Sequence, residues 1–454
     1  MTRPRRVAVV GSGPSGLFAT QALLGNAAVE VEVDIFDRLP APFGLLRYGV
    51  APDHDSIKSI ATVLARVFDS DRVRFFGLVE LGRDVTVAEL TAAYDAVIYA
   101  AGASEDRRMG IPGESLPGSR SAREFVAWYC GHPDAEPQSL AGVTTAVIAG
   151  VGNVAVDVAR ILLKAPGTLA GTDMPDPVLA QLAAARVSDV WVVGRRGPEH
   201  ASFTTTELRE LLTTPGVAVD IDGVDLAAID SDILDRRTRA NVAALTDAVQ
   251  RSVEQPRSRL HFLFWHRPVE LAGAGRVERV RVERTVPAGP GRVGGSGDLQ
   301  VIEAQLVLRA IGYRGIPLPG VPFDADTGRI PNREGRVVEL DGTPRPGEYA
   351  VGWIKRGPIG VIGTNKADAA ETVAHLIADL AGTEPPGLSD LMSTLAARGF
   401  TPSTLADWKR IDAAELERGR LSGRERVKIE AWHELLDLVR LGQPGGPPTV
   451  ADLR

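Results

Sequence analysis

Two glycine-rich turns in this chain have the spacing that binds the pyrophosphate of a dinucleotide. They read GSGPSG at residues 11–16 and GVGNVA at residues 150–155. In the first, Gly11 permits a tight bend, Gly13 lets backbone N–H groups approach a pyrophosphate, and Gly16 lets helix and strand pack closely. A helix that begins in such a turn adds partial positive charge for the phosphates. The pattern predicts two dinucleotide sites.

The residue that ends the following strand differs between the two turns. Asp37 stands there in the first, and a carboxylate at this point bonds the hydroxyls of an unphosphorylated ribose. Arg195 and Arg196 stand there in the second, and arginines favour a 2′-phosphate. The first site is therefore expected to take FAD or NAD, and the second NADP(H). A solvated basic pair is the alternative for the arginines.

Each turn needs a strand before it and a helix after it. Short apolar or alternating runs predict the strands, and helical stretches follow both turns and a third glycine-rich stretch at residues 357–363. The expected strands are 7–10, 29–36, 94–101, 146–149, 190–193, 261–265, 277–282, 306–311 and 349–353, and the expected helices are 17–24, 156–163, 366–380, 407–418 and 426–441. Residues 289–297 are expected to form a flexible hairpin tip.

Composition narrows the class of protein. The 454 residues carry a net charge of −7, so the overall field does not favour nucleic acid. The single cysteine excludes a redox dithiol, a cysteine-ligated iron–sulfur cluster and a four-cysteine zinc site. Neither a targeting segment nor a membrane span is expected, the histidines lack metal-ligand spacing, and a cytoplasmic location without a bound metal is predicted.

The sequence resembles the NADPH–ferredoxin reductases of the adrenodoxin reductase family, in particular their bacterial two-domain members. The resemblance covers nearly the whole chain. It rests on PFGLLRYGVAPDH at residues 42–54, GNVAVDVAR at 152–160, VGRRGP at 193–198, FTTTELRE at 203–210 and VGWIKRGPIGVIGTNK at 351–366, besides the first turn. The family often has Glu where Asp37 stands and Trp where Phe43 stands.

The resemblance implies an α/β architecture of two Rossmann-like domains with a helical C-terminal tail. A discontinuous FAD domain would comprise residues 1–104 and 321–454, and an NADP domain of residues 105–320 would be inserted in it. The implied FAD contacts are Ser15, Asp37, Leu45, Leu81, Arg107, Trp353, Gly360, Val361 and Ile362. The implied NADP contacts are Gly152, Asn153, Val154, Ala155, Arg195, Arg196, Glu207 and Gly360.

The resemblance also implies an activity and its catalytic residues. NADPH would reduce FAD, and single electrons would pass to a ferredoxin-type iron–sulfur protein, with the chain acting as a monomer. His54, Glu210 and Asp157 lie in matching blocks and are predicted to be catalytic, with His54 and Glu210 passing a proton to solvent. The alternative for His54 is a helix cap. The alternatives for the whole protein are an electron-input subunit of a larger complex and a general NADPH diaphorase.

One basic stretch could dock an acidic ferredoxin. Residues 251–284 contain eight arginines and no lysine, against four acids. Charge complementarity would favour binding of an acidic partner if these arginines gather on one surface. The alternative is a set of separately solvated strand faces.

Overall fold

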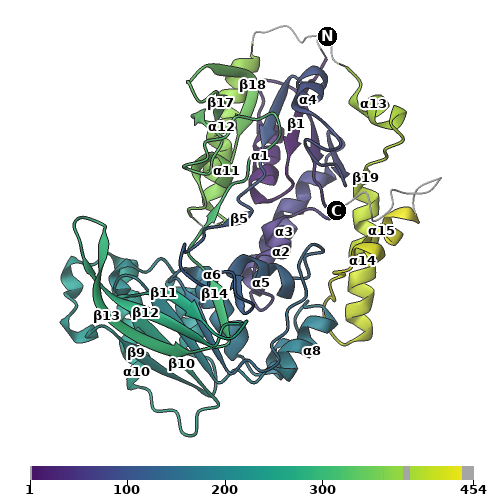
Figure 1. Cartoon of the computed structure of the whole chain (residues 1–454). Helices are drawn as coiled ribbons and strands as arrows, with labels where there is room; N and C mark the ends of the chain where they lie inside the picture. Colours follow the sequence, from purple (N-terminus) through teal and green to yellow (C-terminus); the bar gives the residue numbers. More distant parts are fainter. Residues whose placement is uncertain (1–2, 361, 382–388, 442–454) are drawn as a thin grey trace. The chain divides into compact units, whose positions relative to one another are not determined.

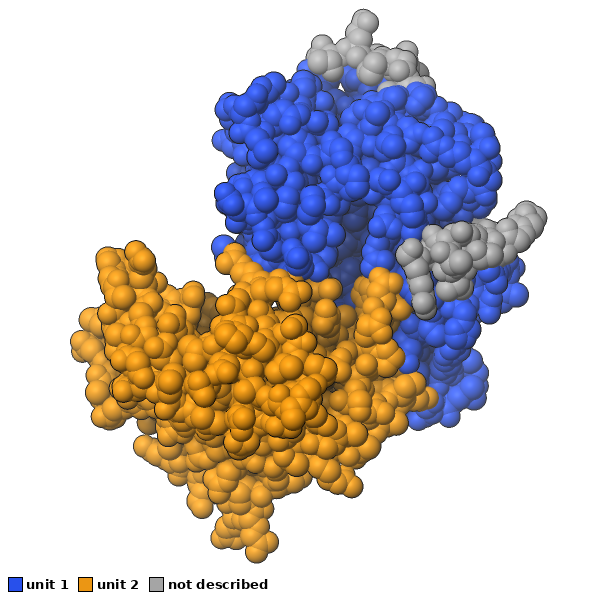
Figure 2. All heavy atoms as spheres, in the orientation of Figure 1, with its two compact units in different colours: residues 1–50, 54–105, 313–454 blue, residues 51–53, 106–312 orange. Residues whose placement is uncertain are grey.

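The chain forms two compact units, shown in different colours in Figure 2. The computed structural model describes residues 3–360, 362–381 and 389–441, with the main chain alone at residues 55–58. Unit 1 comprises residues 1–50, 54–105 and 313–454, and unit 2 comprises residues 51–53 and 106–312. The chain therefore leaves unit 1, builds unit 2 and returns.

The expected domain ranges differ from these units at their edges. Glu105 and residues 313–320 group with unit 1 instead of with the inserted domain. Residues 313–320, where the chain comes back from unit 2, are already bonded to unit 1, because Gly315 donates its N–H to the carbonyl of Gly328 at 3.0 Å. Residues 51–53 group with unit 2, although residues on both sides of them belong to unit 1.

Unit 1 is built on an eight-stranded sheet with the order β16-β17-β18-β4-β1-β2-β3-β19. The strands from β18 to β3 run parallel, and the short edge strands run antiparallel. The strands are β1 (Arg5–Val10), β2 (Val31–Phe36), β3 (Val73–Gly77), β4 (Ala96–Tyr99), β16 (Asn332–Arg333), β17 (Arg336–Val338), β18 (Pro344–Ala350) and β19 (Ser403–Thr404). Figure 1 shows β1 and β18 with their flanking helices.

Side chains along the sheet of unit 1 point alternately to its two faces, and each face packs in a separate hydrophobic core. Val7 and Val9 of β1 belong to one core, and Ala8 belongs to the other. The helices that supply the first core include α1 (Pro14–Gly25), α2 (Leu45–Tyr48), α3 (Asp55–Ala65), α12 (Thr364–Leu380), α14 (Leu405–Leu421) and α15 (Trp432–Arg440). The second core is supplied by α4 (Val87–Ala93), α11 (Trp353–Arg356) and α13 (Leu391–Ala397). Sheet and helices of unit 1 therefore form one layered body around the β1–α1 turn.

The C-terminal region contains a shorter last helix than the sequence predicts. Residues 426–441 were expected to be helical throughout, but α15 begins only at Trp432. The preceding residues have no regular secondary structure, and α14 holds them: Val427 donates its N–H to the Glu415 carbonyl at 3.0 Å, and Ile429 donates its N–H to the Glu415 carboxylate at 2.9 Å. Long-range bonds thus replace the local helical ladder.

Unit 2 is built on a six-stranded parallel sheet with the order β6-β14-β7-β8-β10-β9. Its strands are β6 (Ser119–Ser121), β7 (Thr145–Ala149), β8 (Asp189–Gly194), β9 (Val217–Asp222), β10 (Ser258–Phe264) and β14 (Leu306–Arg309). The helices that pack in its main core include α5 (Ala122–Tyr129), α6 (Asn153–Leu163), α8 (Asp176–Ala184), α9 (Thr205–Leu212) and α10 (Arg236–Gln250). Parallel strands joined through helices form the expected Rossmann-like sheet.

A three-stranded antiparallel sheet packs on one face of the six-stranded parallel sheet of unit 2. It consists of β11 (His266–Ala272), β12 (Arg279–Pro287) and β13 (Val293–Glu303), and its apolar side packs on Val147 and Val193. The expected hairpin tip at residues 289–297 is too wide. Gly294 and Gly295 pair with β12, so residues 288–292 make the turn. Among the described residues, no helix is long and apolar enough to cross a membrane.

Candidate dinucleotide-binding and redox site

The first glycine turn joins β1 to α1 in unit 1. Gly11 has φ +109°, and a Cβ there would lie 2.5 Å from the carbonyl oxygen of Ala100. A Cβ at Gly16 would collide with the carbonyl of Gly11, so helix and strand pack at backbone distance. At Gly13, by contrast, an added Cβ would come no closer than 3.9 Å to any atom, and that atom is the Cα of Gly44. Gly44 therefore lies at ordinary van der Waals distance from this position, unlike the close backbone approaches at Gly11 and Gly16.

Asp37 follows β2 and braces this turn. Its carboxylate accepts hydrogen bonds from the backbone N–H of Ser12 at 2.9 Å, from the Ser12 hydroxyl and from the backbone N–H of Leu39 at 3.0 Å. A carboxylate offers about four acceptor positions, so about one remains for a ribose hydroxyl. The structure places Asp37 at the turn, as the spacing predicts, and gives it a bracing role that the spacing does not reveal.

Leu45, a predicted FAD contact, is the first residue of the short helix α2 (Leu45–Tyr48). Leu45 is 39% exposed, which leaves it able to contact a ligand. Leu81, also predicted to contact FAD, is instead buried in the second core of unit 1 and pairs with Val85 in an isolated bridge. The structure therefore separates these two leucines by exposure.

The third glycine stretch packs against the start of α1. A Cβ at Gly352, where φ is +74°, would collide with the hydroxyl of Ser15. Trp353 begins α11, and its buried indole Nε1 has no hydrogen-bond partner among the described residues. Such a buried donor costs about 1–3 kcal/mol unless a ligand or water satisfies it. The site thus contains a donor that a bound cofactor would satisfy.

The remaining residues of this stretch lead into α12. Gly360 has φ +88°, which favours glycine, and Ile362 is partly buried against the first core of unit 1. Ile359 beside them is 73% exposed. Val361, which was also predicted to contact FAD, lies outside the described residues.

The second glycine turn joins β7 to α6 in unit 2. Gly150 has φ +129°, and an added Cβ would collide with the carbonyl of Ala310. Asn153 accepts the backbone N–H of Thr204 at 2.7 Å through its side-chain oxygen. Thr204 in turn caps α9, which carries Glu207. The turn and α9 are therefore locked together, with Gly152, Asn153, Val154 and Ala155 all at the start of α6.

Arg195 and Arg196 follow β8, next to the second turn. Neither guanidinium forms an ion pair with a described acid. Their main chain is fixed instead: the Thr285 hydroxyl donates to the Arg195 carbonyl at 2.8 Å, and the Trp265 N–H donates to the Arg196 carbonyl at 3.4 Å. The backbone is held and the two positive side chains remain available for a phosphate.

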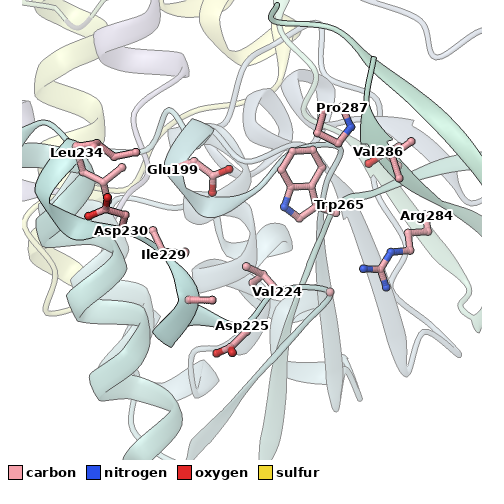
Figure 3. Close-up of a pocket in the computed structure, with 14 residues that line it drawn as sticks. Glu199, Val224, Asp225, Ile229, Asp230, Leu234, Trp265, Arg284, Val286 and Pro287 are labelled. Atoms are coloured by element: carbon pink, nitrogen blue, oxygen red, sulfur yellow. The ribbon is translucent and has the colours of Figure 1, made fainter. Parts of the chain in front are cut away.

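A cavity of about 510 Å³ adjoins this loop in unit 2 (Figure 3). Trp265, whose φ is +54°, and Thr285 form part of its wall. Apolar side chains and charged groups of both signs share the lining, among them Glu199, Asp225 and Arg284. The walls come from distant stretches of the chain, so the spacing of residues in the sequence does not reveal the cavity. Trp265 is the residue in it with an unusual backbone conformation.

Arg160 is the organising residue that sequence reasoning missed. It is fully buried in α6, and its guanidinium lies 2.9 Å from Asp157, 3.7 Å from Glu207 and 3.9 Å from Glu210. The structure therefore gathers all three predicted acids of unit 2 around one cation. A signal existed: Asp157 and Arg160 are the charged residues of the otherwise apolar helix NVAVDVARILL and stand three positions apart, on one face.

Asp53 completes this cluster. Its carboxylate accepts Arg160 Nε at 2.8 Å and Nη2 at 2.9 Å, and it also binds Lys164. Burial alone would raise the pKa of Asp53, but the hydrogen bonds and charges of Arg160 and Lys164 outweigh it and hold that pKa well below its ordinary value. These bonds explain why residues 51–53 group with unit 2.

His54 and Arg107 lie where the chain changes units. His54 is buried, belongs to unit 1 and occupies the position before α3 (Asp55–Ala65), yet its side chain does not cap that helix. Arg107 belongs to unit 2, unlike the other predicted FAD contacts, and its side chain is exposed. Glu210, the predicted partner of His54, also belongs to unit 2.

The arginines of residues 251–284 are spread over several elements and are mostly engaged. Two donate to backbone carbonyls and three pair with acids, namely Arg251 to Leu212, Arg257 to Leu163, Arg259 to Asp220, Arg267 to Glu283 and Arg281 to Glu270. Arg276, Arg279 and Arg284 are exposed and have no such partner among the described residues. This arrangement favours separately solvated faces over one docking patch.

Known proteins similar to this chain were found by sequence and by structure. The NADPH-ferredoxin reductase FprA of Mycobacterium tuberculosis is 45% identical over 456 residues, covering 96% of this chain and 99% of that protein. The mitochondrial NADPH:adrenodoxin oxidoreductase of Homo sapiens is 40% identical over 465 residues, covering 96% and 92%. The solved structure of Mycobacterium tuberculosis FprA in complex with NADPH matches with a TM-score of 0.90 over 97% of this chain and 100% of that chain. No family model matches.

Proposed function

Because the chain belongs to the family of NADPH-ferredoxin reductases and NADPH:adrenodoxin oxidoreductases, we propose that it is an FAD-dependent ferredoxin–NADP+ reductase. Unit 1 binds FAD, unit 2 binds NADP(H), and the electron acceptor is a ferredoxin-type iron–sulfur protein. Bound FAD supplies the step that nicotinamide cannot make, because it accepts two electrons with a hydride and releases them one at a time.

The observation that carries this proposal is the contrast between the two strand ends. In unit 1 the carboxylate of Asp37 meets the first turn, and in unit 2 the guanidiniums of Arg195 and Arg196, which pair with no acid of the described residues, follow β8. An anionic 2′-phosphate would be repelled by the first arrangement and bound by the second. The two sites are thus suited to two different dinucleotides, as a transfer between NADPH and a flavin requires.

The residues of unit 1 fit FAD in two further respects. No side-chain hydrogen bond caps α1 at Gly13, so the backbone N–H groups at the start of that helix would donate to a pyrophosphate. The buried indole N–H of Trp353 lacks an acceptor among the described residues and would donate to a polar atom of the cofactor. Both features are costly or purposeless in a protein without a ligand at this place.

The acid–base residues divide between binding and proton transfer. Glu207 and Asp157 are held by Arg160 and orient the nicotinamide end of the coenzyme. Glu210, whose carboxylate is 45% exposed, can exchange protons with solvent. His54 would accept a proton released at the bound flavin, because an imidazole changes charge near neutral pH. The chain acts as a cytoplasmic monomer without a bound metal; these three points remain predictions.

A spectrum, an anaerobic NADPH titration and a cytochrome c reduction assay test the proposal. The purified protein should be yellow, with one non-covalent FAD per chain, and anaerobic NADPH should bleach it. Cytochrome c reduction should depend strongly on an added ferredoxin-type protein. A general diaphorase would instead reduce cytochrome c without that protein. A colourless protein that takes up no FAD on reconstitution would refute the assignment of unit 1.

A further inference from the structure

A buried charge cluster in unit 1 joins the C-terminal helices to the segment that borders the first glycine turn. The guanidinium of Arg47, in α2, forms a bidentate pair with the carboxylate of Glu415, in α14. Glu415 is fully buried and Arg47 is 7% exposed. Bidentate geometry of this kind fixes orientation as well as charge.

Further bonds from the stretch between α14 and α15 complete the cluster. Lys428 donates its ammonium to the carbonyl of Arg47 at 2.6 Å. Arg426 donates to the carboxylate of Glu415 at 3.0 Å, and the N–H of Ile429 donates to the same carboxylate at 2.9 Å. Burial alone would raise the pKa of Glu415, but the charge and hydrogen bonds of Arg47 keep it below its ordinary value, so the carboxylate stays ionised.

The segment that this cluster grips touches the turn directly. Phe43 donates its N–H to the carbonyl of Ser12 at 3.0 Å, inside the glycine turn. A Cβ at Gly44, where φ is +49°, would lie 2.9 Å from the Cα of Gly13. Trp408 of α14 closes the chain of contacts, since its ring lies 6.0 Å from the ring of Phe43 and 5.0 Å from the guanidinium carbon of Arg47.

Local structure cannot hold this segment by itself. Helix α2 has four residues, which is a single turn and far below the length at which a helix is stable in isolation. Phe43, just before it, has φ +85°, an unfavourable conformation for an aromatic residue that persists only where surrounding contacts impose it. The contacts from α14 and from residues 426–429 therefore help to hold residues 43–48 against the turn, together with the packing of Leu46 in the first core.

We infer that Arg47 and Glu415 are positioning residues for FAD, and that the C-terminal helical region thereby forms part of the FAD site of unit 1. The inference rests on the proposed function, because it assigns FAD to the first turn. Neither residue touches the cofactor in this scheme. They act by holding residues 43–48 against the turn that binds the pyrophosphate.

The test measures release of FAD from the holoprotein. Glu415→Gln keeps size and removes the charge, and we expect FAD to dissociate at least about tenfold faster at a temperature well below melting, as followed by the fluorescence of released FAD. Glu417→Gln is the matched control on the same helix, because Glu417 is exposed and pairs with Arg420. That variant should release FAD at the wild-type rate.

The double variant Arg47→Met with Glu415→Met separates positioning from mere stability. Replacing a buried pair by apolar residues often preserves folding stability, so the protein should melt near the wild-type temperature. If the pair positions the segment, this stable variant still releases FAD quickly, and its unit 2 still binds 2′,5′-ADP as wild type does. Wild-type retention of FAD in the double variant, or in Glu415→Gln, would overturn the inference. Failure of wild type to bind FAD would refute the proposed function instead.

Discussion

Replacing Arg160 by methionine should destabilise unit 2 because it removes the cation at the centre of four carboxylates. The substitution keeps most of the side-chain volume. It removes the positive charge that Arg160 presents to Asp53, Asp157, Glu207 and Glu210. Lys164 still pairs with Asp53. Breaking a buried pair by removing one partner costs about 3–5 kcal/mol. Lys164 still compensates Asp53, so we expect the lower end, about 3 kcal/mol.

The expected loss is large enough to measure by thermal unfolding. For a unit of this size, about 3 kcal/mol lowers the melting temperature by roughly 6–12 °C. The matched control is Arg279→Met, because Arg279 is exposed on β12 and has no ion-pair partner among the described residues. An exposed substitution of that kind usually changes stability by less than about 0.5 kcal/mol.

The pH dependence supplies a second readout of the Arg160 cluster. Because the pKa of Asp53 is lowered by folding, its ion pairs contribute stability above its ordinary pKa of 3.8, and that contribution is lost as pH falls through the lowered value. In Arg160→Met, burial is less opposed and the carboxyl takes up a proton at higher pH. The stability gap between wild type and variant should therefore be full at pH 7 and shrink towards pH 4. A gap no larger than that of Arg279→Met, or one independent of pH, would show that Arg160 does not hold these acids together.

Three further results are expected. Replacing both Arg195 and Arg196 by alanine should raise KM for NADPH roughly tenfold or more per arginine, at about 1.5–3 kcal/mol for each charge-assisted bond, while KM for NADH changes little; equal losses for both coenzymes would mean that the pair is structural. His54→Gln should slow flavin reduction or reoxidation and alter its pH profile in stopped-flow traces normalised to bound FAD, whereas an unchanged per-flavin profile would remove His54 from proton transfer. Gly11→Ala should abolish FAD binding, because the added methyl meets the Ala100 carbonyl at 2.5 Å; a variant that still copurifies with stoichiometric FAD would contradict the tight-turn argument.

The sequence by itself determined the two dinucleotide turns and the fold class. Strand, glycine turn and helix are consecutive in the chain, so their residue types and spacing carry the information locally, as at Gly11 and Gly150. The family and the α/β fold predicted from these blocks are confirmed by near-full-length similarity to known reductases. Local patterns failed where long-range bonds overrode them: residues 426–431 are not helical, and Glu415 binds the backbone N–H groups of Val427 and Ile429 instead.

Tertiary structure decided which side chains act together. Arg160 meets Asp53 across 107 residues, and Arg47 meets Glu415 across 368, so no spacing rule could pair them. The same holds for residues 51–53, which belong to unit 2 although their neighbours in the chain belong to unit 1. The carboxylate of Asp53 pairs there with Arg160 and Lys164. A short-range pattern can specify a turn that closes on itself within a few residues. A buried ion pair is specified only when folding brings distant segments to the same place and excludes water from them.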